Sequence, residues 1–437
     1  MAKTLVCIAV CLIGGLLMSR IAKKLSLPAV TSYLVAGLLL GPFLLGRIGI
    51  PGLGFQTLEQ VEGFTVLSQM ALGFIAFAIG NEFRVSQLKV MGRKAIIVGI
   101  LQAVVTTILV DAALVALHFI WPEVLSLSSA ITLGAIAAAT APAATLMVVK
   151  QYKADGPLTK LLLLVVAIDD AVGLILFSAS FGIARALEQG SISLVSVLVE
   201  PLIEIVLSFG LGTLTGLLLY WVERFFHSRS KRLSVSVAFV LLSVGLSMTE
   251  FHIGSVRCGF SLLLVCMMTG IMFCNICNFS EELMARVDRW TAPLNILFFV
   301  ISGAEMDLKI LANPLVLLVG VVYIIFRSLG KYTGASVSCR LTKCSPNITR
   351  YLGITLLPQA GVALGMAQTA GMLSDGPMVR NVVLFSVLVY ELVGPVLTKW
   401  ALTKAGEIHP EGKTSARTAN TATGGPLTVQ TTKSRKA

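Results

Sequence analysis

The sequence predicts an all-α membrane protein of about 13 transmembrane helices with an inverted-topology repeat. Three observations lead to this prediction: an apolar composition, an alternation of basic loops, and a self-similarity at an offset of seven helices. Of the 437 residues, 56% are hydrophobic and only 13% are charged, and a soluble domain has about twice that charged share. A soluble fold could not hide so much apolar surface from water. The composition therefore excludes a disordered chain, a nucleic-acid-binding domain and an ordinary cytosolic enzyme.

The apolar stretches are counted first. A helix needs about 20 apolar residues to cross a hydrocarbon core about 30 Å thick. Thirteen stretches meet this need: 4–19, 27–46, 61–80, 95–120, 128–149, 161–184, 194–221, 233–249, 258–279, 291–306, 313–339, 351–370 and 381–398. We expect residues 1–404 to form the transmembrane domain and residues 405–437, which lack apolar periodicity, to form a disordered cytoplasmic tail. No dinucleotide or phosphate-binding motif is found, and we expect no cofactor.

The basic residues test this count. Loops after odd-numbered stretches carry 19 Lys and Arg residues, and loops after even-numbered stretches carry five. One helix too many or too few would destroy this alternation. By the positive-inside rule, the odd loops and the C-terminus lie in the cytoplasm and the N-terminus lies outside. The net charge of +12 thus reports on topology, and no nucleic-acid partner is expected.

An internal repeat relates the two halves of the chain. The segments 80–88 and 303–311 share the pattern G-x-E-apolar-x-apolar-x-x-L at an offset of 223 residues. A second match pairs 170–173 with 391–394 at an offset of 221 residues. Seven helices separate the copies, and because seven is odd the copies cross the membrane in opposite directions. This is the architecture of many secondary transporters, whose substrate site lies at mid-membrane where the repeats meet.

Two of the stretches, the fifth and the twelfth, are interrupted by proline. Proline removes a backbone donor and clashes with the preceding turn, and its small neighbours tolerate an unwound backbone. Unwound backbone survives at membrane depth only where it lines a cavity or is buried in protein. A simple kink at each proline is the alternative, but breaks at equivalent places in both repeats favour a functional crossing point. The residues at the two breaks are Ala141, Pro142, Pro358, Gln359 and Gly361.

Two adjacent acids, Asp169 and Asp170, lie in the middle of the sixth stretch. Each costs about 2.5–3.5 kcal/mol at the centre of a membrane helix. Neighbouring residues point about 100° apart, so one acid can meet Lys331 of the eleventh stretch while the other faces water and substrate. A carboxylate in such a place can hold either a proton or Na⁺, and this competition suffices for exchange. The alternative is a polar pair that only joins helices.

Other intramembrane polar residues are candidates for the same core. Three acids belong to the repeat and could line the cavity or could cap and pair helices. Arg327 lies one turn before Lys331, and it could pair with a carboxylate or extend to the membrane surface. The candidates are Glu82, Glu305, Glu391 and Arg327.

These motifs resemble the monovalent cation:proton antiporter superfamily, with its sodium/hydrogen exchanger-type membrane domain. The resemblance covers about residues 5–400. It rests on the segments 140–145 (TAPAAT), 167–170 (AIDD), 298–303 (FFVISG), 330–331 (GK) and 356–361 (LLPQAG). The Asp-Asp pair together with the later Lys is its most specific part.

The resemblance implies a homodimer with two crossed, broken helices. A core of the third to sixth and tenth to thirteenth helices would move in elevator fashion against a dimerisation scaffold of the first, second and seventh to ninth. Asp170 would bind Na⁺ directly, while Asp169 would pair with Lys331 until Na⁺ or a proton breaks the pair. Thr140 and the backbone near Pro142 would complete this alkali-cation site. An Asp-Asp pair is typical of the electrogenic branch, in which two protons exchange for one sodium.

One departure concerns ion choice. Some relatives carry an acid after the threonine of the fifth helix, where this chain has Ala141. The choice among Na⁺, Li⁺ and K⁺ therefore stays open. We expect a multi-pass protein of the cell membrane that exchanges Na⁺ or Li⁺ for protons. The alternatives are a K⁺/H⁺ antiporter of the potassium efflux type and a passive cation channel. An intramembrane aspartyl protease is disfavoured because adjacent aspartates point apart.

Overall fold

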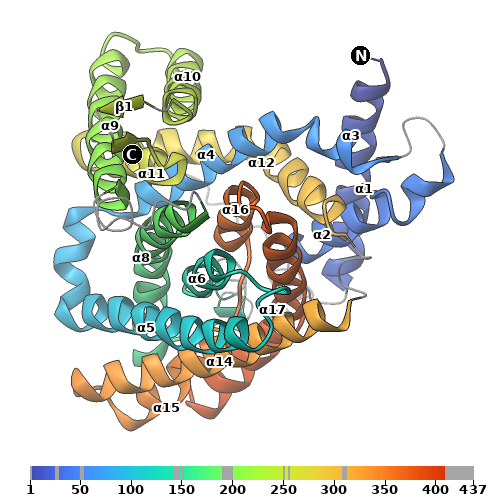
Figure 1. Cartoon of the computed structure of the whole chain (residues 1–437). Coiled ribbons are helices and arrows are strands. Elements are labelled where there is room, and N and C mark those ends of the chain that lie inside the picture. Colours follow the sequence, from blue (N-terminus) through green and yellow to red (C-terminus); the bar gives the residue numbers. More distant parts are fainter. Residues whose placement is uncertain are drawn as a thin grey trace, which may run out of the picture.

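The structure, a computed structural model, describes residues 2–24, 29–49, 54–141, 145, 148–149, 152–188, 200–249, 251–253, 256–307 and 313–408. These described residues fold into a bundle of helices with one short antiparallel strand pair (Figure 1). The first half contains α1 (Ala2–Lys24), α2 (Ala29–Leu40), η1 (Leu45–Ile48), α3 (Leu58–Glu62), α4 (Thr65–Glu82), α5 (Val85–Ile120), α6 (Leu127–Ile136), α8 (Pro157–Glu188) and α9 (Glu200–Glu223). The second half contains α10 (Arg229–Ser247), β1 (Phe251–Ile253), β2 (Val256–Cys258), α11 (Leu262–Ile276), α12 (Ser280–Ala304), α14 (Pro314–Leu341), α15 (Pro346–Thr355), α16 (Gly361–Ala370) and α17 (Gly376–Lys404).

The predicted all-α membrane fold is confirmed, and every predicted apolar stretch contains a helix. Eight described helices are long and apolar enough to cross a membrane, and three shorter apolar helices accompany them. Two local features were not predicted. The antiparallel pair β1 and β2 precedes α11, and α5 begins ten residues before its predicted stretch. The early part of α5 joins the rest across a kink at Gly92, whose φ of 75° suits glycine.

The helices pack in two groups. The first group, α5, α6, α8 and α14–α17, occupies the centre and lower part of Figure 1. The second group, α1, α2, α4 and α9–α12, curves around it along the top and the right. We expected α4 and α12 in the core, but they pack mainly on α11 and α2. The groups meet where α8 contacts α9, α11 and α4, where α16 contacts α4, and where α17 contacts α2.

Glycine explains why α12 lies so close to α2. A Cβ atom at Gly37 of α2 would collide with the carbonyl oxygen of Val300, and one at Gly303 of α12 would collide with that of Leu34. Close backbone approach through small residues is a common way to pack membrane helices. Gly303 lies in the repeated segment 303–311, and its counterpart Gly80 of α4 makes the same kind of contact with Met267 of α11.

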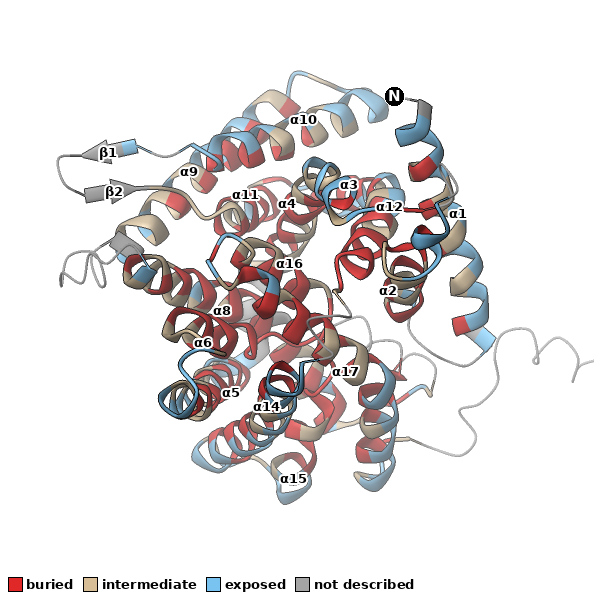
Figure 2. Cartoon of the chain, turned by 45° about the vertical axis from the view of Figure 1, so that its right-hand side comes forward, coloured by how far each residue is buried: buried red, intermediate tan, exposed pale blue. Residues whose placement is uncertain are grey.

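Burial is densest along the middle of the first group, around α6, α8 and α16 (Figure 2). Arg327 and Lys331 are among the largest fully buried side chains of the described residues, so the centre of this group is polar as well as packed. Residues 405–408, at the start of the predicted tail, belong to the described residues. Glu407 is buried and accepts hydrogen bonds from the amides of Leu158 and Thr159, both at 2.7 Å. Residues 409–437 lie outside the described residues.

Candidate functional site

Two helices are interrupted at the centre of the molecule. After α6 ends at Ile136, residues 137–141 leave the helix. After α15 ends at Thr355, residues 356–360 are non-helical until α16 begins at Gly361. The second break contains Pro358 as predicted, whereas Pro142 lies outside the described residues. Both predicted breaks are therefore present in the backbone that the structure describes.

The two breaks contact one another directly. The amide of Ala141 donates to the carbonyl of Pro358 at 2.8 Å. The hydroxyl of Thr140 donates to the carbonyl of Leu356 at 3.3 Å. The side-chain amide of Gln359 donates to the carbonyl of Ile136 at 3.1 Å. Each unwound segment thus supplies partners for backbone groups that the other leaves outside a helix.

Arg327 of α14 joins both breaks. Its guanidinium donates to the carbonyls of Ala137 at 3.0 Å, Ala139 at 2.6 Å and Leu357 at 2.7 Å. It also lies 4.4 Å from the centre of the Tyr390 ring. We expected a carboxylate partner or an extension to the surface, but the described residues form no ion pair with it and it is fully buried. Unwound backbone exposes carbonyl oxygens, and the planar fork of arginine can satisfy several of them together.

Asp169 of α8 lies in a closed polar cluster. Its Oδ2 is 2.7 Å from Nζ of Lys331, and both side chains have no exposed surface. The Thr140 hydroxyl donates to the same oxygen, and the Gln102 amide donates to Oδ1. Lys331 also donates to Oε1 of Gln102 at 3.1 Å and to the carbonyl of Ala138. A buried ion pair is stable only when its remaining donors and acceptors are satisfied, and this cluster meets that condition.

Asp170 points elsewhere, as expected for the next residue of a helix. It is 3% exposed and lines a cavity of about 280 Å³ together with Ala141, Ala360 and Gly361 at the crossing. The opposite wall of the cavity comes from α4 and α12. The cavity thus lies between the two groups of helices, with Asp170 on one side.

A polar stripe of α12 runs along this cavity. Asp288, Thr291 and Asn295 line it, and their spacing places them on one face of the helix. Asp288 is exposed. The cavity therefore connects the buried Asp170 with a charged residue at the surface. Water and small cations can follow such a path, because it offers oxygen ligands in the dry part of the protein.

The other predicted residues lie away from the Asp169 cluster. Glu305 forms an ion pair with Arg380, with 3.1 Å between Oε2 and Nη1, and accepts from Gln368 at 3.3 Å. Glu391 accepts from the Thr31 hydroxyl at 3.2 Å. The side chain of Glu82 lies outside the described residues. Of the candidate acids whose side chains are described, the structure thus brings only Asp169 and Asp170 to the crossing.

Three polar residues of the site were missed in the sequence. Gln102 bridges Asp169 and Lys331, while Tyr323 and Ser386 hold the amide of Gln359 at 2.9 Å and 3.1 Å. All three are fully buried. The signal was available for Gln102, because it is a polar residue in the middle of an apolar stretch. Hydroxyl groups are common in membrane helices and carry no such signal.

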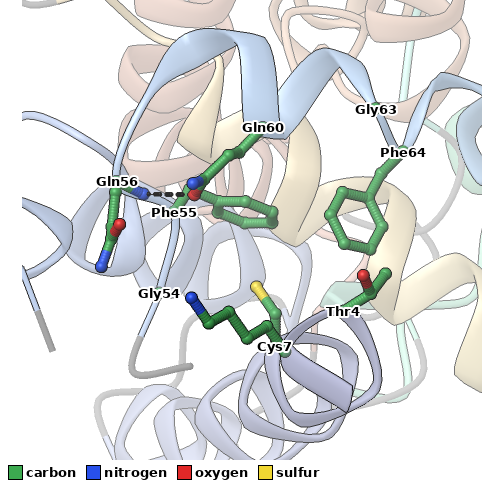
Figure 3. Close-up of a pocket in the computed structure, with 9 residues that line it drawn as sticks. Thr4, Cys7, Gly54, Phe55, Gln56, Gln60, Gly63 and Phe64 are labelled. Atoms are coloured by element: carbon green, nitrogen blue, oxygen red, sulfur yellow. Dashed lines mark hydrogen bonds between the residues drawn. The ribbon is translucent and has the colours of Figure 1, made fainter. Parts of the chain in front are cut away.

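A second cavity of about 300 Å³ lies at the edge of the molecule, between α1 and α3 (Figure 3). Thr4 and Cys7 of α1 face Phe55, Gln56 and Phe64, and the amide of Gln56 donates to Gln60 at 2.9 Å. Its described lining contains no acid. This cavity therefore offers no carboxylate that a cation and a proton could share.

Comparison with known proteins adds two structural matches. The sodium proton antiporter MjNhaP1 of Methanocaldococcus jannaschii at pH 8 superposes with a TM-score of 0.67 at 22% identity, over 92% of this chain and 97% of that chain. An electron-microscopy map of the same antiporter gives a TM-score of 0.64 at 19% identity, over 92% of this chain and 98% of that chain. At these identities the matches establish the fold alone.

A curated relative matches a smaller part of the chain. K(+) efflux antiporter 5 of Arabidopsis thaliana is 37% identical over 92 residues, which is 21% of this chain and 14% of that protein's length. The profile of the family described as "Sodium/hydrogen exchanger, transmembrane" matches residues 8–404, nearly the whole chain. The resemblance seen in the motifs is thereby confirmed, and the chain belongs to the transmembrane sodium/hydrogen exchanger family.

Proposed function

We propose that this protein exchanges a monovalent cation for protons, and that both bind in turn at Asp170. The observation that carries this proposal is the position of Asp170, which lines a cavity at the helix crossing beside the Asp169–Lys331 pair. An acid at this place meets the requirement of antiport, because one carboxylate cannot hold a proton and a metal cation well together.

Charge explains why exchange is obligatory. The site contains two acids and two bases, Asp169, Asp170, Arg327 and Lys331. Lys331 is hydrogen-bonded to Asp169, and Arg327 is hydrogen-bonded to main-chain carbonyls. The positive charge of each base is therefore stabilised mainly by those partners and not by Asp170. A buried carboxylate that holds neither a proton nor a cation is costly. The protein therefore changes conformation when Asp170 is occupied, and the empty site stays where it is.

A second proton, besides the one that binds Asp170, comes from the neighbouring Asp169–Lys331 pair. Arrival of a cation or a proton weakens the contact between Asp169 and Lys331, with Thr140 as a further oxygen ligand close by. Two carboxylates at the crossing then take part in each cycle, and two protons exchange there for one cation. Because the charges do not balance, transport moves net charge and responds to voltage.

The two groups of helices supply the moving parts. We assign α5, α6, α8 and α14–α17 to the core, and α1, α2, α4 and α9–α12 to the scaffold, which also forms a homodimer. This differs from the sequence expectation at α4 and α12, which pack with the scaffold. The cavity lies between the groups, so a displacement of the core changes the side from which Asp170 is reached.

The orientation follows from the basic loops. The cavity extends toward Asp288, which is flanked by Arg286 and Arg289, and toward Ile79, near Arg84. By the positive-inside rule this side faces the cytoplasm. We therefore infer an inward-facing state of a cell-membrane protein with its N-terminus outside and its C-terminus in the cytoplasm.

The transported cation is Na⁺, with Li⁺ as a second substrate. The name of the structural relative includes sodium, and carboxylate and carbonyl oxygens suit such hard cations. A second candidate is K⁺, because a potassium efflux antiporter shares 37% identity over 92 residues. Proteoliposomes that contain a pH-sensitive dye distinguish the two. A response to K⁺ but not to Na⁺ or Li⁺ rejects the sodium assignment.

The role of Asp170 is tested in the same vesicles. We expect Asp170→Asn to abolish exchange, with a loss of about a hundredfold or more, because the amide can bind neither a proton nor a cation as the carboxylate does. Its size is unchanged, so the melting temperature in detergent should stay close to that of the wild type. Exchange at the wild-type rate would reject the site, and Glu305→Gln serves as a control at an acid that lies elsewhere.

A further inference from the structure

Glu391 is a buried acid for which the exchange mechanism above has no use. It lies in the interior of α17 and is 1% exposed. Its Oε2 accepts a hydrogen bond from Thr31 at 3.2 Å, and its Oε1 has no hydrogen-bond partner among the described residues. No described residue forms an ion pair with it. The burial of a carboxyl group with an unpaired oxygen costs free energy, so it calls for a physical explanation.

The fold makes Glu391 the counterpart of Asp170. Each acid is followed three residues later by a glycine that packs against the break of its own repeat. A Cβ atom added at Gly173 would lie 3.7 Å from Cα of Ala139 in the first break, and one added at Gly394 would lie 2.9 Å from Cγ of Pro358 in the second. The sequence match between 170–173 and 391–394 is thus also a match in packing.

The surroundings of Glu391 offer no compensating charge among the described residues. The sequences of α2, α6 and α16, which contact α17, contain no charged side chain. On α14, Arg327 is held by three carbonyls and Lys331 by Asp169, and Arg340 lies near the end of that helix. On α15, Arg350 is exposed and lies beside Tyr351. A charged carboxylate is costly in such a place, so this burial favours the neutral, protonated form of Glu391.

The hydrogen bond of Glu391 also crosses between the two groups of helices. Thr31 belongs to α2 of the scaffold and Glu391 to α17 of the core. Val30, the neighbour of Thr31, lines the cavity that reaches Asp170. Sliding of the core along the scaffold would separate the two side chains and admit water to the carboxyl group.

We propose that Glu391 is a further proton-binding site of the protein, in addition to Asp170 and the Asp169–Lys331 pair, which holds its proton while α17 rests on Thr31 and releases it to water when the helix groups separate. The O–H bond of the carboxyl group breaks and a water molecule on one side of the membrane takes the proton. The resulting Glu391 carboxylate takes a proton from a hydronium ion on the other side before the groups close again. The release step rests on the proposed function, whereas the protonation of Glu391 in this state does not.

Infrared spectroscopy tests the protonation without transport. Purified full-length protein in lipid bilayers, carrying Asp170→Asn, should show the C=O stretching band of a protonated buried carboxyl group. Adding Glu391→Gln should remove that band, whereas adding Glu305→Gln should not, because Glu305 is paired with Arg380. Thr31→Val should keep the band and raise its frequency, since the carbonyl loses its hydrogen bond. A spectrum unchanged by Glu391→Gln overturns the proposal.

Proton counting tests the release. In proteoliposomes, the voltage at which net flux reverses gives the number of protons exchanged for each cation. With Glu391 added to the two carboxylates of the crossing, the wild type should exchange three protons for each cation. Glu391→Gln should lower this number to two, and Thr31→Val should leave it at three. An unchanged number in Glu391→Gln overturns the release step. If the wild type shows no exchange at all, the proposed function fails, and the infrared result still decides whether Glu391 carries a proton.

Discussion

Two neighbouring aspartates of identical chemistry have different surroundings in this protein. Asp169 is surrounded by Lys331, Thr140 and Gln102, and Asp170 lines a cavity between the helix groups. The difference follows from the helix geometry alone, because adjacent side chains point about 100° apart. One acid is therefore held in a buried ion pair while the other faces the cavity.

The Asp169–Lys331 pair gives a prediction about stability. Lys331→Gln leaves Asp169 buried without its cation, and removing one partner of a buried pair costs about 3–5 kcal/mol. We expect a clearly lower melting temperature in detergent, together with altered charge movement per transported cation. The double variant Asp169→Asn with Lys331→Gln should regain most of the lost stability, since no uncompensated charge remains. A double variant as unstable as Lys331→Gln would contradict this explanation.

The two aspartates and the two breaks could be singled out in the sequence, because acids and proline are rare in the middle of an apolar helix. The sequence could not predict the contacts of Arg327. Its partners are main-chain carbonyls of two distant segments, and these become acceptors only after both helices unwind. The same holds for Gln359, whose partners come from three different helices. The residue type shows which groups a side chain can bind, but its partner depends on how the two broken helices cross.

At the scale of elements, the broken helices form one unit with α14. Arg327 donates to both breaks, so α14 fixes their relative position. The repeat could be found in the sequence as two short matches, and the structure adds the packing of Gly173 and Gly394 against the breaks. The grouping of α4 and α12 could not be found in this way, because the apolar residues of a helix carry little information about which neighbouring helix they contact.

Arg327→Lys tests this unit. Lysine keeps the charge but cannot reach three carbonyls in one plane, so two or more of them lose a buried donor at a cost of about 1–3 kcal/mol each. We expect a lower melting temperature and exchange reduced about tenfold or more, since about 1.4 kcal/mol corresponds to a factor of ten. Arg350→Lys on the exposed face of α15 is the matched control and should change neither. Wild-type exchange in Arg327→Lys would mean that the breaks hold their position without this arginine.

At the scale of the whole molecule, the cavity between the helix groups makes a path from the surface to Asp170. Its polar stripe on α12 was not singled out in the sequence, where Asp288 lies next to basic residues at a predicted helix end. An exposed acid at the mouth of a narrow path raises the local concentration of cations. In the proposed mechanism, the scaffold thus has a part in ion supply, although Asp170 belongs to the core.

Asp288→Asn should therefore raise the KM for the cation about two- to tenfold and leave kcat unchanged. The effect should shrink at high ionic strength, because salt screens an exposed charge. Asp155→Asn is the control, since Asp155 is exposed and lies away from the cavity. Its Oδ1 is 3.5 Å from Nζ of Lys160. Cation-dependent flux at several salt concentrations gives both constants, and a KM equal to the wild type at low salt would contradict a role in cation access.

The carboxylate of Glu407 has a consequence for where the polypeptide can be shortened. It accepts hydrogen bonds in the first turn of α8, the helix that carries both aspartates. Such a cap satisfies amide groups that have no acceptor within their own helix. A polypeptide that stops after Ile408 keeps these hydrogen bonds, whereas one that stops at Lys404 loses Glu407 and the bonds with it. The short segment beyond the last long helix thus decides how firmly the helix with both aspartates is anchored.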